Sequence, residues 1–447
     1  MFFVKVNMKQ PNLIWIFGDQ HRAQALGCMG DENVSTPNID ALGADGVTFE
    51  RAVAGCPLCC PYRGSLLSGR YPHRAVPGHQ MRLPPELLTV AQPFRASGYH
   101  TAWFGKWHVD GFQEKDGRAV FHEVPKNRRG GFDTWLGYEN NNAQYDTWLH
   151  GHAGTEEVAN YRLEGYETDV LTDLVLDHIG ERAQGAKPFF AALSAQPPHN
   201  PYVAPPEWMG RHTPSGIALR ENVPPIASVV ERARRELAGY YAMIENLDWN
   251  IGRIVHALRA RGIFDDTHII FFSDHGDMHG SHGQFLKTSP WEEAMRVPFI
   301  VGGGRRYEMK AGTRVDAPVN HVDVGPTSLG LCGIEVPDWM PGTDYSHHRL
   351  RKIPTGNEPD SAYLQLVVPT GHGDSIDRPW RGVATRDGWK YVALEGQPWM
   401  LHNLNEDPYE LANLAFNTRY RTERRRLQER LAQWIDETGD VFVLPEL

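Results

Sequence analysis

Asn12-Leu-Ile-Trp-Ile-Phe17, bounded by Pro11 and Gly18 and followed by Asp19-Gln20, is the stretch from which the fold can be inferred. Short apolar runs of this kind are typical of strands that are buried on both faces of a parallel sheet. Similar runs recur along the chain, and helical patterns lie between them. This alternation predicts an α/β fold with a doubly wound mixed sheet flanked by helices. The expected strands are 12–17, 101–105, 188–193, 268–273 and 298–301, and the expected helices include 88–96, 167–181, 229–261 and 322–331.

A second, smaller unit is expected after the prolines at 337–341. Three runs there have the pattern of antiparallel strands, and residues 418–437 have the pattern of a charged amphipathic helix. Two domains suit the length of 447 residues, since single cores rarely grow beyond about 250–300 residues. We predict a larger domain over residues 1–345 and a smaller C-terminal α+β domain with an antiparallel sheet over residues 346–447. Residues 118–148 are expected to form a long surface loop.

Composition excludes several classes of protein. The chain has 45 basic and 55 acidic residues, a balance that argues against nucleic-acid binding. Its five cysteines are too few for a disulfide scaffold, and their odd number leaves a free thiol. The opening Met1–Met8 lacks the apolar region of a signal peptide, and no apolar run approaches the roughly 18–20 residues that span a membrane. We therefore expect a cytoplasmic protein without nucleic-acid or membrane partners.

Polar side chains follow four of the predicted strands at their carboxyl ends, which is where open α/β sheets bind ligands. A single aspartate after a strand is usually a helix N-cap. The occurrence of polar residues after four strands, together with the cysteine-rich stretch at 56–60, favours a functional site instead. Two carboxylates, a carboxamide and an imidazole form a cation site with mainly oxygen donors, more typical of Ca²⁺, Mg²⁺ or Mn²⁺ than of structural zinc. We assign as ligands of one divalent cation Asp19, Gln20, Asp274 and His275.

The second informative stretch is Cys56-Pro-Leu-Cys59-Cys60-Pro61-Tyr62-Arg63, which continues to Gly69-Arg70. No second Cys or His cluster at zinc spacing accompanies its three cysteines, so neither a zinc ribbon nor a disulfide framework accounts for them. A single reactive cysteine is the better interpretation. We expect Cys60 to pack beneath it as a small buried hydrophobe.

Cys59-x-Pro61-x-Arg63 followed by Gly69-Arg70 resembles the C-x-P-x-R…G-R element of the formylglycine-dependent sulfatases, type I members of the alkaline-phosphatase-like superfamily. The resemblance implies an alkaline-phosphatase-like fold, a catalytic domain over residues 1–345 and hydrolysis of sulfate monoesters. It also implies that a formylglycine-generating enzyme oxidises Cys59 to formylglycine, whose hydrated aldehyde is the nucleophile. The cation implied by the resemblance is Ca²⁺, with Mn²⁺ as the alternative.

The same resemblance implies a role for each of five further residues. Arg63 would hold the nucleophile electrostatically, and Lys106 and Lys287 would bind the sulfate. His199, acting with Lys287, would protonate the departing alcohol. His108 would then deprotonate the remaining hydroxyl of the aldehyde hydrate, so that sulfate is expelled.

Two departures from the family pattern leave alternatives open. Gln20 and His275 replace the second member of the Asp-Asp and Asp-Asn pairs of many sulfatases, a pattern similar to phosphonate monoester hydrolases and, at His275, to choline sulfatases. Hydrolysis of phosphonate monoesters or phosphodiesters is therefore the first alternative. A catalytically silent binding protein with an unmodified Cys59 is the second.

The alcohol half of the substrate is not encoded in any motif. Aromatic and polar residues at 135–152 and 372–381 suit a sugar or aryl pocket, and equally suit ordinary loop packing. We expect a small sulfate ester, including a sulfated sugar, as the substrate. The sequence leaves the oligomeric state open, a homo-oligomer included.

Overall fold

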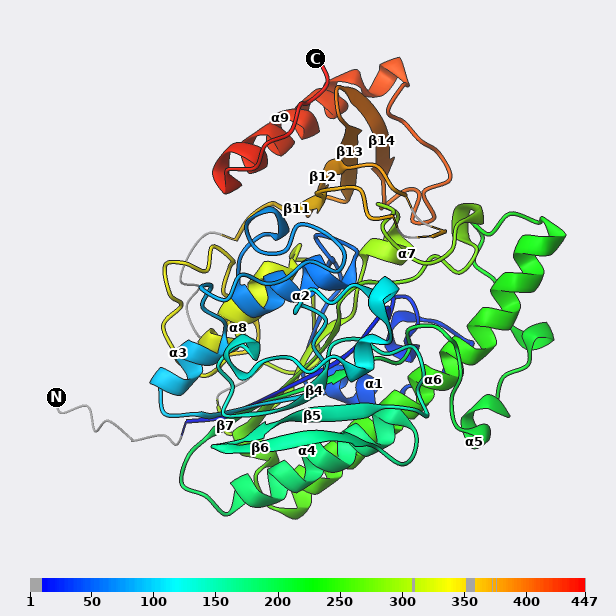
Figure 1. Ribbon diagram of the computed structural model, residues 1–447. Helices are drawn as coiled ribbons and strands as arrows, with labels where there is room; N and C mark the ends of the chain where they lie inside the picture. Colours follow the sequence, from blue (N-terminus) through cyan, green and yellow to red (C-terminus); the bar gives the residue numbers. More distant parts are fainter. Residues whose placement is uncertain (1–9, 308–309, 351–357, 372, 375, 447) are drawn as a thin grey trace.

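The computed structural model describes residues 10–307, 310–350, 358–371, 373–374 and 376–446. A ten-stranded mixed sheet forms the body of the molecule, and a four-stranded antiparallel sheet forms a smaller C-terminal domain (Figure 1). The predicted fold class is thereby confirmed. The order in the large sheet is β10 (Thr313–Val315), β2 (Val47–Phe49), β9 (Phe299–Gly303), β8 (Thr267–Ser273), β1 (Asn12–Gly18), β7 (Phe189–Ala195), β3 (His100–Lys106), β4 (Thr134–Tyr138), β5 (Trp148–Ala153) and β6 (Glu156–Arg162).

Four parallel strands, β8, β1, β7 and β3, lie side by side in the centre of this sheet. They are four of the five strands predicted for the larger domain, and they are the same four that polar residues follow. Because parallel neighbours end at the same edge, the sheet brings these polar residues together.

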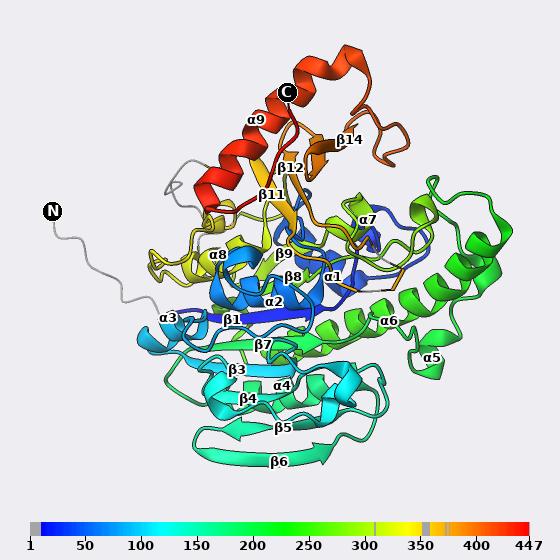
Figure 2. The ribbon, with the colours of Figure 1, turned by 45° about the horizontal axis from the view of Figure 1, so that its top comes forward.

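Alternation along β1 divides the core between the two faces of the sheet. Leu13, Trp15 and Phe17 pack into one apolar cluster, and Ile14 and Ile16 pack into another. Figure 2 shows the strands between the two layers of helices. The first face is covered by α2 (Cys59–Ser68), α3 (Ala91–Ala96) and α8 (Val324–Leu331), and the second by α1 (Pro37–Ala44), α4 (Glu167–Ala183) and α6 (Ala227–Ala260).

The expectation of a surface loop at 118–148 is wrong in its second half. Strand β4 pairs in parallel with β3, and β5 and β6 then extend the sheet in antiparallel fashion. Trp135 and Tyr138 of β4 are fully buried. The region therefore completes one side of the sheet. Within the described residues, no helix has both the length and the apolar character needed to cross a membrane.

The C-terminal sheet has its strands in sequence order: β11 (Ser361–Leu366), β12 (Trp380–Thr385), β13 (Trp389–Leu394) and β14 (Gln397–Asn403). Helix α9 (Arg421–Thr438) covers one face through Leu427 and Leu431. The other face packs against the large domain, where it meets Leu58 and Met295. The boundary between residues 345 and 346 stays a prediction.

A buried ion cluster also joins the two domains. Lys390 of β13 has no exposed surface, and its Nζ lies 2.9 Å from Oε1 of Glu292, in α7 (Glu292–Met295). The same nitrogen lies 2.5 Å from Oε1 of Glu410. Because burial makes an unpaired charge costly, the ammonium group is required to neutralise the two carboxylates.

We expect Lys390→Met to lower the free energy of unfolding by about 3–5 kcal/mol, since it leaves two buried carboxylates without their cation. Guanidinium denaturation measures the change. The matched control is Lys126→Met, which removes an exposed pair with Glu157 and should leave the midpoint nearly unchanged. Equal losses in the two variants would contradict this account.

Candidate active site

The ten predicted site residues are all buried. Nine of them form one network of hydrogen bonds and ion pairs at the carboxyl edge of the central strands. The nine are Asp19, Gln20, Cys59, Arg63, Lys106, His199, Asp274, His275 and Lys287.

Cys59 lies at the centre of this network. It is the first residue of α2, so its side chain stands at the positive end of the helix dipole. Its Sγ lies 3.1 Å from Nε2 of His275 and 3.2 Å from Nζ of Lys287. The carboxylate of Asp19 is 3.5 Å from the same sulfur. A nucleophile at the position of this sulfur would therefore contact an imidazole, an ammonium group and a carboxylate.

The residues around Cys59 fit a divalent cation. Asp19, Cys59, Asp274 and His275 each offer one ligand atom, and these atoms lie within 4.8 Å of one another. Nδ1 of His275 bonds to the carbonyl oxygen of Gly276 at 2.9 Å, and since a carbonyl can only accept, the proton is on Nδ1 and Nε2 keeps its lone pair. Carboxylate oxygens with one imidazole suit a hard or borderline cation.

Gln20, the fourth predicted ligand, is fixed by its neighbours. Its Oε1 accepts from Nζ of Lys287 at 2.9 Å, and its Nε2 donates to Asp277. The hydroxyl of Tyr202 donates to the same oxygen of Asp277 at 2.5 Å. The amide oxygen of Gln20 is thereby turned toward the Lys287 side of the site, where the Cys59 sulfur lies.

Arg63 organises the charges beneath the site. Its guanidinium lies 3.1 Å from Oδ2 of Asp19 and 3.2 Å from Oδ2 of Asp274. Burial alone would raise the pKa of Asp19, but Lys106, His199 and Arg63 hold it well below its usual value. The pKa of Asp274 is raised by burial and by repulsion from Asp19. A cation between the two carboxylates would remove this repulsion.

Two lysines, Lys106 and Lys287, add positive charge to the site. Nζ of Lys106 lies 2.7 Å from Oδ2 of Asp19. Nζ of Lys287 lies 3.0 Å from Nε2 of His199, whose Nδ1 bonds to the carbonyl of Asn200 at 2.7 Å. Nε2 of His199 therefore accepts a hydrogen bond from the ammonium group of Lys287. Burial and the charge of Lys287 lower the pKa of His199 well below its usual value, so the imidazole is neutral and Lys287 carries the proton.

His108 stands apart from the other nine residues. It is 3 % exposed, and neither of its ring nitrogens has a hydrogen-bond partner among the described residues. Its φ of 59° lies in the left-handed region, an uncommon conformation for a residue other than glycine. Burial and then the nearby Lys106 lower its pKa well below the usual value, so the imidazole is neutral. A neutral imidazole without a partner can accept a proton.

Three supporting residues were not assigned from the sequence. Asp277 orients Gln20, Ser194 binds Arg63 at 2.8 Å, and Glu167 accepts from the hydroxyl of Tyr138 at 2.6 Å. Asp277 lies three residues after Asp274 in the same polar segment that follows β8. This position is the sequence feature that could have indicated its supporting role. The contacts of Ser194 and Glu167 depend on distant parts of the chain, which local patterns do not reveal.

Comparison with known proteins identifies the family. The sequence model of the sulfatases matches residues 11–334, and that of the C-terminal part of N-sulphoglucosamine sulphohydrolase matches residues 280–437. The chain is 34% identical to an ulvan-active sulfatase of Formosa agariphila, over 97% of this chain and 82% of the relative. It is 24% identical to an N-acetylglucosamine-6-O-sulfatase of Bacteroides thetaiotaomicron, over 96% of this chain and 87% of the relative.

Solved structures agree with this assignment. A putative sulfatase yidJ of Bacteroides fragilis superposes with a TM-score of 0.84 at 25% identity, covering 98% of both chains. A phosphonate monoester hydrolase of Agrobacterium radiobacter has the same fold, with a TM-score of 0.78 at 23% identity over 96% of both chains. The chain belongs to the sulfatase family, and it is a sulfuric ester hydrolase.

We expect a divalent cation to stabilise the protein, because an ion that binds only the folded state adds about 2.7 kcal/mol at 100 times its dissociation constant. Differential scanning calorimetry with and without chelator measures the rise in Tm. Asp274→Asn should abolish most of this rise, whereas Asp265→Asn, outside the site, should preserve it. A cation-dependent rise of equal size in Asp274→Asn would exclude the assigned ligands.

Proposed function

We propose that the enzyme hydrolyses sulfate monoesters of sugars and other small alcohols through a formylglycine derived from Cys59, with Ca²⁺ held by Asp19, Gln20, Asp274 and His275. The observation that carries the proposal is the position of the Cys59 sulfur, within 3.5 Å of an imidazole, an ammonium and a carboxylate. Formylglycine supplies a geminal diol as nucleophile, and the cation supplies Lewis-acid polarisation of a hydroxyl.

The surrounding residues have the properties that sulfate ester cleavage requires. Negative charge spreads over the nonbridging oxygens in the transition state, and preorganised cations stabilise it most effectively in a buried site. Lys106 and Lys287 are both buried; Lys106 contacts Asp19 and Lys287 contacts Cys59. We assign these lysines to the sulfate oxygens, and Arg63 to fixing the two carboxylates.

The proton for the departing alcohol comes from the Lys287–His199 pair. Lys287 holds the proton in the free enzyme, because the pKa of its ammonium is raised by nearby Cys59 and Asp19 despite burial. The pair is joined by the 3.0 Å bond between Nζ and Nε2, along which a proton can pass. His108, neutral and without a hydrogen-bond partner among the described residues, is the base that accepts the second proton.

A sugar substrate is supported by the relatives and by one feature of the surface. The N-acetylglucosamine-6-O-sulfatase relative acts on a sugar sulfate, as its name states. A cavity of about 270 Å³ is lined by Arg118 and by Asn140, Asn141 and Asn142. The side chain of Asn142 accepts from Gln196, which follows β7 as His199 does. Carboxamides and a guanidinium suit the hydroxyl groups of a sugar.

Replacement of the nucleophile is the direct test. Cys59→Ala should lower kcat/KM for an aryl sulfate by at least about 10³-fold, since the chemistry loses its attacking group. Mass spectrometry of the Cys59 peptide should show conversion of the thiol to the aldehyde in active wild-type protein. Cys28→Ser, a thiol away from the site, is the control and should keep full activity.

The same preparations separate the two candidate esters. Gln20 and His275 favour phosphonate chemistry as a second candidate, so kcat/KM should be compared for an aryl sulfate and an aryl phosphonate. We expect the sulfate to react faster. A faster reaction with the phosphonate would show that phosphonate esters are the preferred substrates. Full turnover by Cys59→Ala would show that Cys59 is not the source of the nucleophile.

The role of Lys287 as proton donor predicts a dependence on the leaving group. General acid catalysis contributes about 10²–10⁴-fold when the leaving alkoxide is basic, and little when it is a stable phenolate. Lys287→Ala should therefore lower kcat for an alkyl sulfate much more than for nitrophenyl sulfate. Lys106→Ala is the matched control, and it should lower both rates by similar factors. Equal losses in Lys287→Ala would assign Lys287 to sulfate binding alone.

A further inference from the structure

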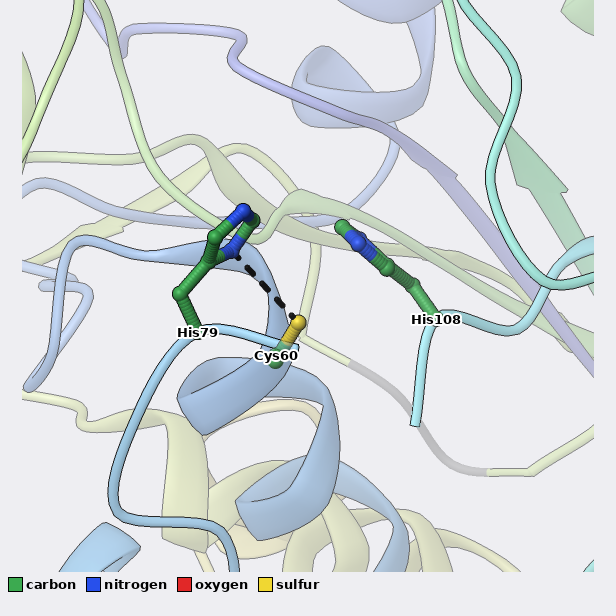
Figure 3. A group of neighbouring side chains, drawn as sticks. All are labelled: Cys60, His79 and His108. Atoms are coloured by element: carbon green, nitrogen blue, oxygen red, sulfur yellow. Dashed lines mark hydrogen bonds between the residues drawn. The ribbon is translucent and has the colours of Figure 1, made fainter. Parts of the chain in front are cut away.

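Three side chains outside the hydrogen-bonded Cys59 network gather near the start of α2: Cys60, His79 and His108 (Figure 3). Cys60 is the second residue of α2, His79 lies in the segment after that helix, and His108 follows β3. The two imidazole rings project toward each other from opposite sides, with the Cys60 sulfur between them. One ligand atom of each residue lies within 4.8 Å of the others, and Cys60 Sγ is 3.8 Å from His79 Nδ1.

His108 is the member of the group that lacks a hydrogen-bond partner among the described residues, whereas Cys60 and His79 contact each other. Buried polar atoms in folded proteins are nearly always paired, yet neither ring nitrogen of His108 has a partner among the described residues. Its ring meets that of His79 edge to face, with centroids 5.7 Å apart. The sulfur of Cys60 accepts the backbone N–H of Gln80 at 3.3 Å. Burial and the neighbouring Cys59 raise the pKa of the Cys60 thiol well above its usual value, so the group carries its proton until a metal ion displaces it.

The donor set selects a different kind of ion from the Asp19 site. One sulfur and two imidazole nitrogens are the ligands of zinc-class cations, whereas carboxylate oxygens suit Ca²⁺. In a tetrahedral zinc site the sulfur and nitrogen ligands lie about 3.5 Å apart. The 3.8 Å between Cys60 and His79 is already close to this value, and the ligand atoms of all three residues lie within 4.8 Å of one another. His79 is half-buried, which gives an ion a route to the site.

We propose that Cys60, His79 and His108 form a second metal site, selective for zinc-class ions, and that its occupation inhibits the enzyme. His79 and His108 each donate a nitrogen lone pair. The metal ion replaces the thiol proton of Cys60, so one proton is released to solvent for each ion bound. Inhibition follows because a coordinated His108 cannot accept a proton; this part rests on the proposed function, whereas binding does not.

Binding is tested apart from catalysis. Cd²⁺ is titrated into the full-length Cys59→Ala protein in saturating Ca²⁺, so that the Asp19 site is occupied and its thiol is absent. Thiolate-to-cadmium charge-transfer absorption and proton release are recorded. We expect one equivalent of Cd²⁺ and one proton. Adding Cys60→Ser should remove the absorption, and adding Cys28→Ser should preserve it. Absence of the absorption, or its persistence in Cys60→Ser, would overturn the site.

Inhibition is tested with Zn²⁺ on formylglycine-containing enzyme in Ca²⁺. Cys60→Ser and His79→Gln should keep basal activity and raise the half-inhibitory Zn²⁺ concentration at least tenfold. His79→Gln serves as the second variant if Cys60→Ser does not fold. Unchanged inhibition in both variants would overturn the inhibitory role. Cys60-dependent Cd²⁺ binding in a protein without sulfatase activity would instead refute the proposed function and leave the metal site standing.

Discussion

The buried guanidinium of Arg63 is the interaction on which the arrangement of the site depends. It binds Asp19 after β1 and Asp274 after β8. It also donates to the carbonyl of Lys106 at the end of β3 and to the hydroxyl of Ser194 in β7. One side chain thus ties together the ends of the four central strands. Arg63 is four residues after Cys59 in α2, so both lie on one face of the helix, and the spacing of the motif has a geometric reason.

The charges around Cys59 explain how an acidic protein can bind an anionic ester. The chain carries a net charge of −10, but in the site three cations face two carboxylates. Because all five groups are buried, solvent and salt screen them little, and the local excess of positive charge governs the approach of a sulfate. A divalent cation would increase this excess. The overall charge therefore indicates solubility and says little about the substrate.

The sequence predicted those site residues whose position depends on a short, local stretch of the chain. A buried parallel strand followed by a polar residue is visible in the chain, so Asp19, Lys106 and Asp274 could be placed at one edge before their contacts were known. The sheet beyond β3 was missed, because glycines and asparagines in 118–148 obscure the short run of β4. The supporting role of Asp277 was missed too. It depends on Tyr202 and Gln20, which meet Asp277 only after folding.

Two adjacent cysteines lie in different chemical environments because they belong to one helix. Successive residues of an α-helix point about 100° apart, so Cys59 and Cys60 cannot face the same neighbours. Cys59 faces His275, Lys287 and a carboxylate, while Cys60 faces His79 and the backbone of Gln80. The first thiol is next to an imidazole, an ammonium and a carboxylate, and the second is next to an imidazole without any carboxylate contact among the described residues. Helix geometry therefore separates the proposed nucleophile, Cys59, from Cys60, the proposed ligand of a second metal ion.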